Sequence, residues 1–202
     1  MTGDVEARRL PREFFRRPTA MLARALPGKL LVRPGVGAGR PPPRVARIVE
    51  VEAYLGERDA ASHARRGPTP RAAIMFGPAG FLYVYLVYGM HHCMNVVTED
   101  DGVAGAVLLR AAEPVAGIAV DEADPRPLAG PGKLCRGLGI TRADNGLDLC
   151  AEASGLFLAD DGSRPPRVAR SARIGVAYAG DWAARELRFY VPGNPHVSAR
   201  PR

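Results

Sequence analysis

The stretch over residues 80–90, GFLYVYLVYGM, constrains the fold of this chain more than any other. Its large apolar and aromatic side chains would alternate between the two faces of a strand, with Tyr83 and Tyr85 together on one face. Tyr88 is followed at once by a glycine, which favours a turn. The pattern therefore predicts a strand with two tyrosines on one surface and a third at its tip.

The remaining apolar segments are short and separated by Gly- and Pro-rich turns, which predicts a mostly antiparallel sheet and an α+β fold. Strands are expected at residues 29–33, 45–56, 93–98, 104–112, 155–160, 173–180 and 187–191. Helices are expected within residues 17–29, 70–76 and 132–138. We expect residues 17–202 to form a single domain and the basic segment 1–16 to be loosely ordered.

The chain is basic, with 28 Lys and Arg residues against 21 Asp and Glu residues and a net charge of +7. Such a surface favours a polyanionic partner, and nucleic acid is the first candidate. A solvated basic protein with no such partner would account for the charge equally well. The three cysteines form no CxxC pair, and residues 1–17 contain no apolar segment typical of a secretory signal. These features predict a cytoplasmic protein without a membrane span.

No cofactor or metal motif stands out. His91, His92 and Cys93 are adjacent, a spacing that suits no ordinary zinc site. The segment LAGPGKLC lacks the first glycine and the Ser or Thr of a phosphate loop. Backbone N–H groups at a helix start beside Lys133 remain a candidate contact for one phosphate of a nucleic-acid backbone. We therefore expect neither a cofactor nor a metal.

The segment RIVEVEAYLG places Ile48, Glu50, Glu52 and Tyr54 on one face of a strand whose other face is apolar. Taken alone, this pattern favours a solvent-facing polar side. The sharper interpretation puts one glutamate in a desolvated pocket, where it acts as a general base. Tyr54 would then form an aromatic wall, and His63 in the following loop could reach the pocket mouth. A carboxylate with aromatics and no metal suits hydrolysis at a nucleoside or sugar.

Two other functions fit parts of this pattern. A sugar glycosidase could use Glu50 and Glu52 as its carboxylate pair, although their spacing puts them about 6–7 Å apart on one strand face rather than across a substrate bond. A nucleic-acid-binding module without enzymatic activity could use the tyrosines to stack on bases.

Several long blocks, in a shared order, resemble the alkyladenine (3-methyladenine) DNA glycosylase family. They are RIVEVEAYLGERDAASHARRGPTPRAAIMF, GFLYVYLVYGMHHCMNVVT, AVLLRAAEP, GPGKLCRGLGI and RIGVAYAGDWAARELRFYVPGNPHVS. The resemblance covers nearly all of the chain from about Phe14. It implies a compact domain with a curved sheet flanked by helices and a β-hairpin that enters duplex DNA. It also implies a monomeric, monofunctional enzyme that flips alkylated or deaminated purines into a pocket and hydrolyses their N-glycosidic bond.

The resemblance further implies roles for individual residues. Glu52 matches the general base, and Arg110 and the backbone carbonyl of Ile174 match groups that position the attacking water. Tyr88 matches the side chain that fills the gap left by the flipped nucleotide. The base pocket is implied to contain Tyr54, His63, Tyr85 and Asn95. Met90 and Lys133 are further candidates for contacts with the DNA backbone, and Glu50 is expected to matter much less than Glu52.

Overall fold

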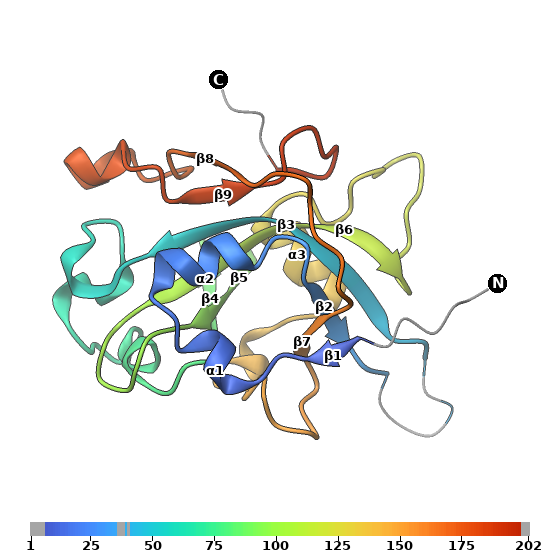
Figure 1. Ribbon diagram of the computed structural model, residues 1–202, viewed down its shortest axis with the longest axis horizontal. Coiled ribbons are helices and arrows are strands. Elements are labelled where there is room, and N and C mark those ends of the chain that lie inside the picture. The colour runs from blue at the N-terminus through green and yellow to red at the C-terminus, as the bar shows by residue number, and fades with distance from the viewer. Residues whose placement is uncertain (1–6, 36–38, 40, 199–202) are drawn as a thin grey trace.

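Strand β3 (Arg44–Tyr54) is the central strand of the sheet that the described residues form. The computed structural model describes residues 7–35, 39 and 41–198. One edge of β3 pairs with β6 (Ala106–Ala116), while the other pairs first with β2 (Leu30–Arg33) and then with β9 (Arg188–Tyr190). Figure 1 shows β8 and β9 lying along one side of the crossing β3 and β6 strands.

The other strands extend this sheet in both directions, and every pairing between described strands is antiparallel. Its order is β1-β7-β2-β3-β6-β5-β4, with β9 on β3 and β8 on β9. The remaining strands are β1 (Arg8–Arg9), β4 (Leu82–Val87), β5 (His91–Val97), β7 (Phe157–Asp160) and β8 (Ala169–Ser171). The α-helices are α1 (Arg12–Phe15), α2 (Thr19–Ala25) and α3 (Pro131–Leu138). The described residues also form the 3-10 helices η1 (Gly56–Arg58), η2 (His63–Arg66), η3 (Ala73–Phe76), η4 (Arg142–Asp144) and η5 (Ala177–Ala183).

One face of the sheet packs into the hydrophobic core, and the other lines a cavity. On β4, Leu82 and Val84 point into the main hydrophobic core, where side chains from α1, α2 and α3 pack. Tyr83 and Tyr85 point to the opposite face and line a cavity. The alternation predicted for this strand is therefore confirmed, and it separates the residues that stabilise the fold from those that form a pocket.

Paired β-bulges interrupt the alternation at the middle of β3. Ile48 pairs with Ala112 and Glu50 with Ala111, so the register passes over Val49 on β3. The next pair joins Val51 to Leu109, so the register then passes over Arg110 on β6. Bulges bend a strand and redirect a side chain, and they are common beside functional sites. The simple alternation predicted from the sequence is wrong here, because Ile48 lies in the core with Val51 rather than beside Glu50.

A tight hairpin turn joins β4 to β5, and its tip is the Tyr88–Gly89 pair. The Met90 N–H donates to the Val87 carbonyl at 3.0 Å. Both tip residues have left-handed backbone angles, with φ of 51° at Tyr88 and 70° at Gly89. This is the conformation of turns that match the twist of two-residue hairpins, and glycine adopts it without strain. The turn predicted after Tyr88 is therefore confirmed.

The described residues form one α+β domain, as the sequence predicts, with two local corrections. Residues 8–15 are not loosely ordered: β1 pairs with β7, and Phe15 on α1 is completely buried in the core. The charged side chains that suggested disorder here lie on the surface of elements whose apolar side chains are buried. Residues 1–6 of that predicted segment, and residues 36–38 and 40 of the Gly/Pro-rich loop, lie outside the described residues. Within the described part, no helix is long and apolar enough to cross a membrane.

The second correction concerns residues 173–180, which form no strand. Gly175 has a φ of 77°, and Gly180 has a φ of 58° inside η5. These positive φ angles interrupt extended backbone, and Ile174, Val176 and Tyr178 of this segment line the cavity instead of joining the sheet.

Truncation of Phe15 tests whether the N-terminal segment is part of the core. Phe15→Ala should lower the free energy of unfolding by about 3–5 kcal/mol, because it removes a completely buried ring that packs edge-on against Phe14. Met21→Ala on α2 is the matched control, since Met21 is 62% exposed and should change stability little. Urea denaturation measures both. Equal stability of the two variants would mean that this segment does not contribute to the core.

Candidate active site

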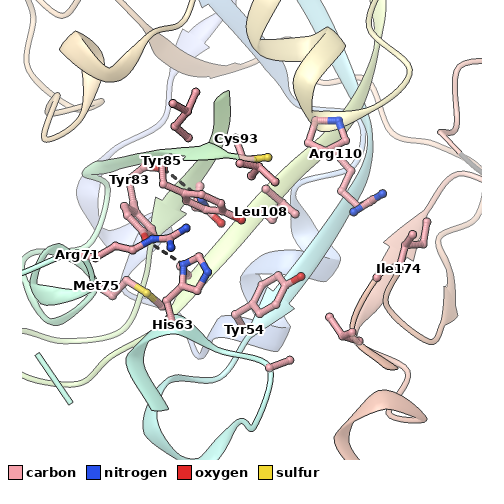
Figure 2. A pocket seen from close by; sticks show the side chains of 18 of the residues that line it. Tyr54, His63, Arg71, Met75, Tyr83, Tyr85, Cys93, Leu108, Arg110 and Ile174 are labelled. Atoms are coloured by element: carbon pink, nitrogen blue, oxygen red, sulfur yellow. Dashed lines mark hydrogen bonds between the residues drawn. The ribbon is translucent and has the colours of Figure 1, made fainter. Parts of the chain in front are cut away.

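A cavity of about 460 Å³ opens on the face of the sheet opposite the main core. Its lining comes from β3, β4, β5, β6, the η2 and η3 region, the start of α3 and the segment before η5. Figure 2 shows aromatic side chains on two sides of this space, with Arg110 and Ile174 at one end. The volume is in the range typical of sites for small organic groups.

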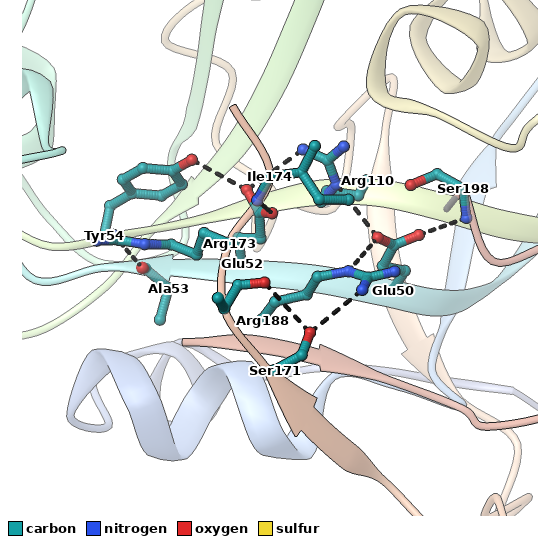
Figure 3. Close-up of polar contacts among 11 residues, drawn as sticks. Glu50, Glu52, Ala53, Tyr54, Arg110, Ser171, Arg173, Ile174, Arg188 and Ser198 are labelled. Atoms are coloured by element: carbon teal, nitrogen blue, oxygen red, sulfur yellow. Dashed lines mark hydrogen bonds and ion pairs between the residues drawn. The ribbon is translucent and has the colours of Figure 1, made fainter. Parts of the chain in front are cut away.

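Glu52 lies behind one end of the cavity and is completely buried. Its Oε2 accepts hydrogen bonds from the Tyr54 hydroxyl at 3.0 Å and from Arg110 Nη1 at 3.3 Å. Its Oε1 accepts the backbone N–H of Ile174 at 2.7 Å (Figure 3). The three residues that donate to Glu52 also line the cavity. The carboxylate is thus held in one orientation directly beside the pocket.

Burial raises the pKa of Glu52, and this effect outweighs the Arg110 charge, the Ile174 amide and the Tyr54 hydroxyl, which lower it. Burial and the neighbouring Glu52 charge raise the pKa of Tyr54, which therefore stays protonated and donates its hydroxyl hydrogen. A carboxylate whose pKa lies above its ordinary value is a stronger base than in water, which suits it to accepting a proton.

Two aromatic walls face the cavity. On one side, the Tyr54 ring is held against the Arg173 guanidinium, whose Cζ lies 4.7 Å from the ring centroid. On the other side, Tyr85 contacts the edge of the His63 ring, with centroids 4.7 Å apart. The sequence prediction that Tyr54, His63 and Tyr85 gather around one site agrees with this geometry.

His63 is fixed by a hydrogen bond of 2.9 Å between its Nδ1 and the Tyr83 hydroxyl. Burial, followed by the nearby Arg71 guanidinium, lowers the pKa of His63 to about 4. Its ring is therefore uncharged at neutral pH. Asn95, almost fully buried on β5, also lines the cavity and donates from Nδ2 to the Tyr83 carbonyl at 3.1 Å.

A buried ion pair connects the two sides of the site. Arg173 Nη2 lies 2.9 Å from Asp59 Oδ1, and its Nη1 also donates to the Ala53 carbonyl. Asp59 in turn accepts the N–H groups of Leu55 and Ala61. This network ties the loop that carries His63 to the segment that carries Ile174. Neither residue was predicted from the sequence, because each stands alone in its segment and only the fold brings them together.

Glu50 is completely buried as well, which contradicts the solvent-facing interpretation of this strand face. Its carboxylate accepts hydrogen bonds from Arg188 Nε at 2.7 Å, Arg110 Nε at 3.2 Å and the Ser198 N–H at 2.6 Å. In Figure 3, Glu50 and Ser198 lie on one side of the Arg110 guanidinium, and Glu52 lies on the other. Glu50 is therefore not placed across a substrate from Glu52, as a sugar glycosidase with this carboxylate pair would require.

The remaining predicted residues lie outside the pocket interior. Tyr88 is 90% exposed at the tip of the β4–β5 hairpin and borders the cavity, and Met90 beside it is 71% exposed. Lys133 lies in the first turn of α3, where its Nζ is 2.6 Å from Asp124 Oδ1. The structure thus groups Tyr88 with the site, whereas Met90 does not line the cavity and Lys133 lies in a surface ion pair.

Several lining residues were not singled out as site residues from the sequence. Tyr83 shares a strand face with Tyr85, so its alternation was an available signal. Arg71 lies over the Tyr85 ring, with its Cζ 4.8 Å from the centroid, and nothing in its local sequence indicates this. Other additional lining residues include Met75, Cys93, Leu108 and Tyr178. Within the described part of the chain, no three His, Cys, Asp or Glu side chains are arranged to hold a metal.

Comparison with known proteins identifies the class to which this fold and site belong. The sequence model of the methylpurine-DNA glycosylase family matches residues 13–195, and the chain belongs to that family. It is therefore a DNA glycosylase, a hydrolase that acts on N-glycosyl bonds of DNA in base excision repair.

Its relatives are similar over nearly their whole length. A protein of Anaeromyxobacter dehalogenans is 52% identical over 96% of this chain and 87% of its own. One from Myxococcus xanthus is 50% identical over 95% and 94%, and one from Legionella pneumophila is 44% identical over 95% and 98%. All three carry the name "Putative 3-methyladenine DNA glycosylase".

Substitution of Tyr88, at the exposed and strained hairpin tip, tests whether this residue contributes to function without stabilising the fold. Tyr88→Asn should leave the free energy of unfolding unchanged or raise it by up to about 1 kcal/mol, because Asn-Gly suits this left-handed turn. Excision from duplex DNA should become slower by an amount that corresponds to about 1–3 kcal/mol of lost stacking.

Thermal unfolding and single-turnover excision measure the two effects. Tyr88→Phe is the matched control, since it keeps the ring and should retain most of the activity. A destabilised Tyr88→Asn protein with a normal rate per folded molecule would assign Tyr88 a packing role instead.

Proposed function

We propose that this chain acts as a monomer that removes alkylated and deaminated purines from duplex DNA and leaves an abasic site. The observation that carries the proposal is Glu52, a buried carboxylate whose pKa is raised and which adjoins a cavity with aromatic walls. Aromatic faces suit a flipped base, because enzymes of this kind stack and enclose the nucleotide that they extrude.

Glu52 is the general base in this mechanism. It accepts a proton from a water molecule while the water oxygen forms a bond to C1′ of the deoxyribose. The C1′–N bond breaks and its electron pair leaves with the purine. A purine that carries a positive charge from alkylation departs as a neutral base, so a single carboxylate is sufficient for such lesions. Arg110 orients Glu52 through Nη1, and its positive charge is balanced by the two glutamates that it contacts.

The pocket walls would select and hold the base. Tyr54 supports one side, with His63 and Tyr85 on the other. The uncharged His63 ring avoids repulsion of a cationic purine. We assign Asn95, at the cavity wall, the role of obstructing the 2-amino group of normal guanine.

The hairpin would provide the contact that replaces the extruded base. Tyr88 projects from its tip with almost its whole ring exposed, and insertion between base pairs offsets part of the free energy lost when stacking is disrupted. Met90 follows on the same turn and would contact the adjacent backbone. Lys133 would reach a DNA phosphate only after giving up its ion pair with Asp124.

Substitution of Glu52 tests the chemical step. Glu52→Gln should lower single-turnover excision of alkylated purines by roughly 10²–10⁴-fold, because the amide cannot accept the proton from water. Binding to lesion DNA should change far less, since the side chain keeps its shape. Glu57→Gln on η1 is the matched control, because Glu57 is exposed. Near-normal excision by Glu52→Gln would remove the proposed mechanism.

The positions of the two lysines lead us to expect that the enzyme does not cut the DNA strand. Strand cleavage of this type requires an amine that forms a Schiff base with the sugar. Lys29 is buried and lies 2.7 Å from Asp160, while Lys133 is paired with Asp124, and neither lines the cavity. Borohydride should therefore trap no protein–DNA adduct during excision. Trapping of a covalent adduct would show that an amine reaches the sugar.

A further inference from the structure

Glu50 accepts hydrogen bonds from three donors, as Glu52 does, although it does not line the cavity. Both of its oxygens are occupied: Oε1 accepts from Arg188 Nε and Arg110 Nε, and Oε2 accepts the Ser198 N–H. Glu50 is completely buried, and Arg188 and Arg110 are nearly so. The donors come from β6, β9 and the C-terminal segment, so the carboxylate joins three separate parts of the chain (Figure 3).

Arg110 links this carboxylate to Glu52. Its Nε contacts Glu50 at 3.2 Å and its Nη1 contacts Glu52 at 3.3 Å, so one guanidinium bridges the two glutamates. Arg110 is also the residue that the β6 register passes over, so its direction depends on the bulge and on these contacts. The shorter contact to Glu50, at 2.7 Å, is made by Arg188, which brings a second positive charge.

The charges of this cluster balance. Two carboxylates, Glu50 and Glu52, lie among two guanidiniums, Arg110 and Arg188. If Glu50 were neutral, the same two positive charges would act on Glu52 alone. A buried charge without a partner is costly, so Arg110 would then move toward the carboxylate that remains.

We propose that Glu50 is a positioning residue of the glycosylase, which holds Arg110 between the two carboxylates. The positive charge of Arg110 is then shared between Glu50 and Glu52, so that Glu52 remains a stronger base than it would be with Arg110 to itself. The proposal rests on the function proposed above for Glu52. It replaces the expectation that Glu50 matters much less than Glu52, which followed from assigning the role of general base to Glu52. The Ser198 N–H contributes to the same arrangement, because it donates to Glu50 Oε2. The hydrogen bonds that Glu50 accepts from Arg110 Nε and Arg188 Nε go to the other oxygen, Oε1.

The direction of the effect follows from the charges around Glu52. It faces Arg110 from β6, Arg173 from the segment before η5, and Glu50 and Tyr54 from its own strand, with Tyr85 and Cys93 nearby. Loss of the Glu50 charge removes a like charge and frees Arg110, and both changes lower the pKa of Glu52. A weaker base stays ionised at lower pH but accepts the proton from water less readily.

The test measures single-turnover excision from methylated duplex DNA between about pH 4.5 and 9 for the full-length enzyme and Glu50→Gln. In the wild type, the rate should fall on the acid side at a pH above 4.5, because burial raises the pKa of Glu52. In Glu50→Gln we expect this fall to move down by about one pH unit and the plateau rate to drop about tenfold. A merely structural role would lower the amount of folded enzyme and leave the pH dependence where it was.

A backbone substitution keeps the test decisive if Glu50→Gln fails to fold or shows no activity. Ser198→Pro removes the N–H that Glu50 accepts, whereas Ser198→Ala keeps this N–H and serves as its reference. Relative to Ser198→Ala, we expect the plateau rate of Ser198→Pro to fall about 3- to 10-fold, with the acid-side fall at lower pH.

Each outcome decides one question. Identical pH profiles for Ser198→Pro and Ser198→Ala, or an acid-side fall that is unchanged or moved to higher pH in Glu50→Gln, would overturn the positioning role. Failure of the wild-type enzyme to release any base would overturn the proposed function itself, whatever the variants do.

Discussion

Two carboxylates buried side by side are the constraint on which the rest of this structure depends. Glu50 and Glu52 are two residues apart on the central strand, and neither is exposed to solvent. An isolated ionised carboxylate in such surroundings would be strongly unfavourable. The fold compensates with Arg110 from β6 and Arg188 from β9, together with backbone N–H groups of Ile174 and Ser198. The C-terminal third of the chain is thereby tied to the central strand.

The same constraint explains the irregular geometry at the middle of the sheet. A regular β3–β6 ladder would alternate without interruption, and Ile48 would then share the face of Glu50. The bulges at Val49 and Arg110 place Ile48 in the core and let Arg110 reach both glutamates. The regular ladder is interrupted at this point, and the Arg110 guanidinium is directed toward the cavity.

Rigid and exposed features are separated within the site. The residues beside Glu52 lie on paired strands or are held by the buried Arg173–Asp59 ion pair, which suits a pocket that must keep its shape. The hairpin tip is the opposite case: Tyr88 has an exposed ring and a left-handed backbone that a bulky residue adopts at some cost. The walls around Glu52 are thus fixed, whereas the hairpin tip projects from the surface.

The sequence by itself determined the sheet-rich α+β fold, the hairpin tip and the pocket tyrosines, because alternation and Gly-containing turns depend on neighbours along the chain. It also pointed to Glu52, Tyr54 and His63 as a site, and the long blocks indicated the family. Only the tertiary structure decided that Glu50 is buried, that Arg173 pairs with Asp59 and that residues 173–180 form no strand. The first two features depend on contacts between residues more than 100 positions apart, whereas the third depends on the positive φ angles that Gly175 and Gly180 adopt in the folded chain. Local pattern carries no information about which distant arginine will neutralise a given carboxylate, so the charge balance around Glu50 and Glu52 emerges only when the chain is folded.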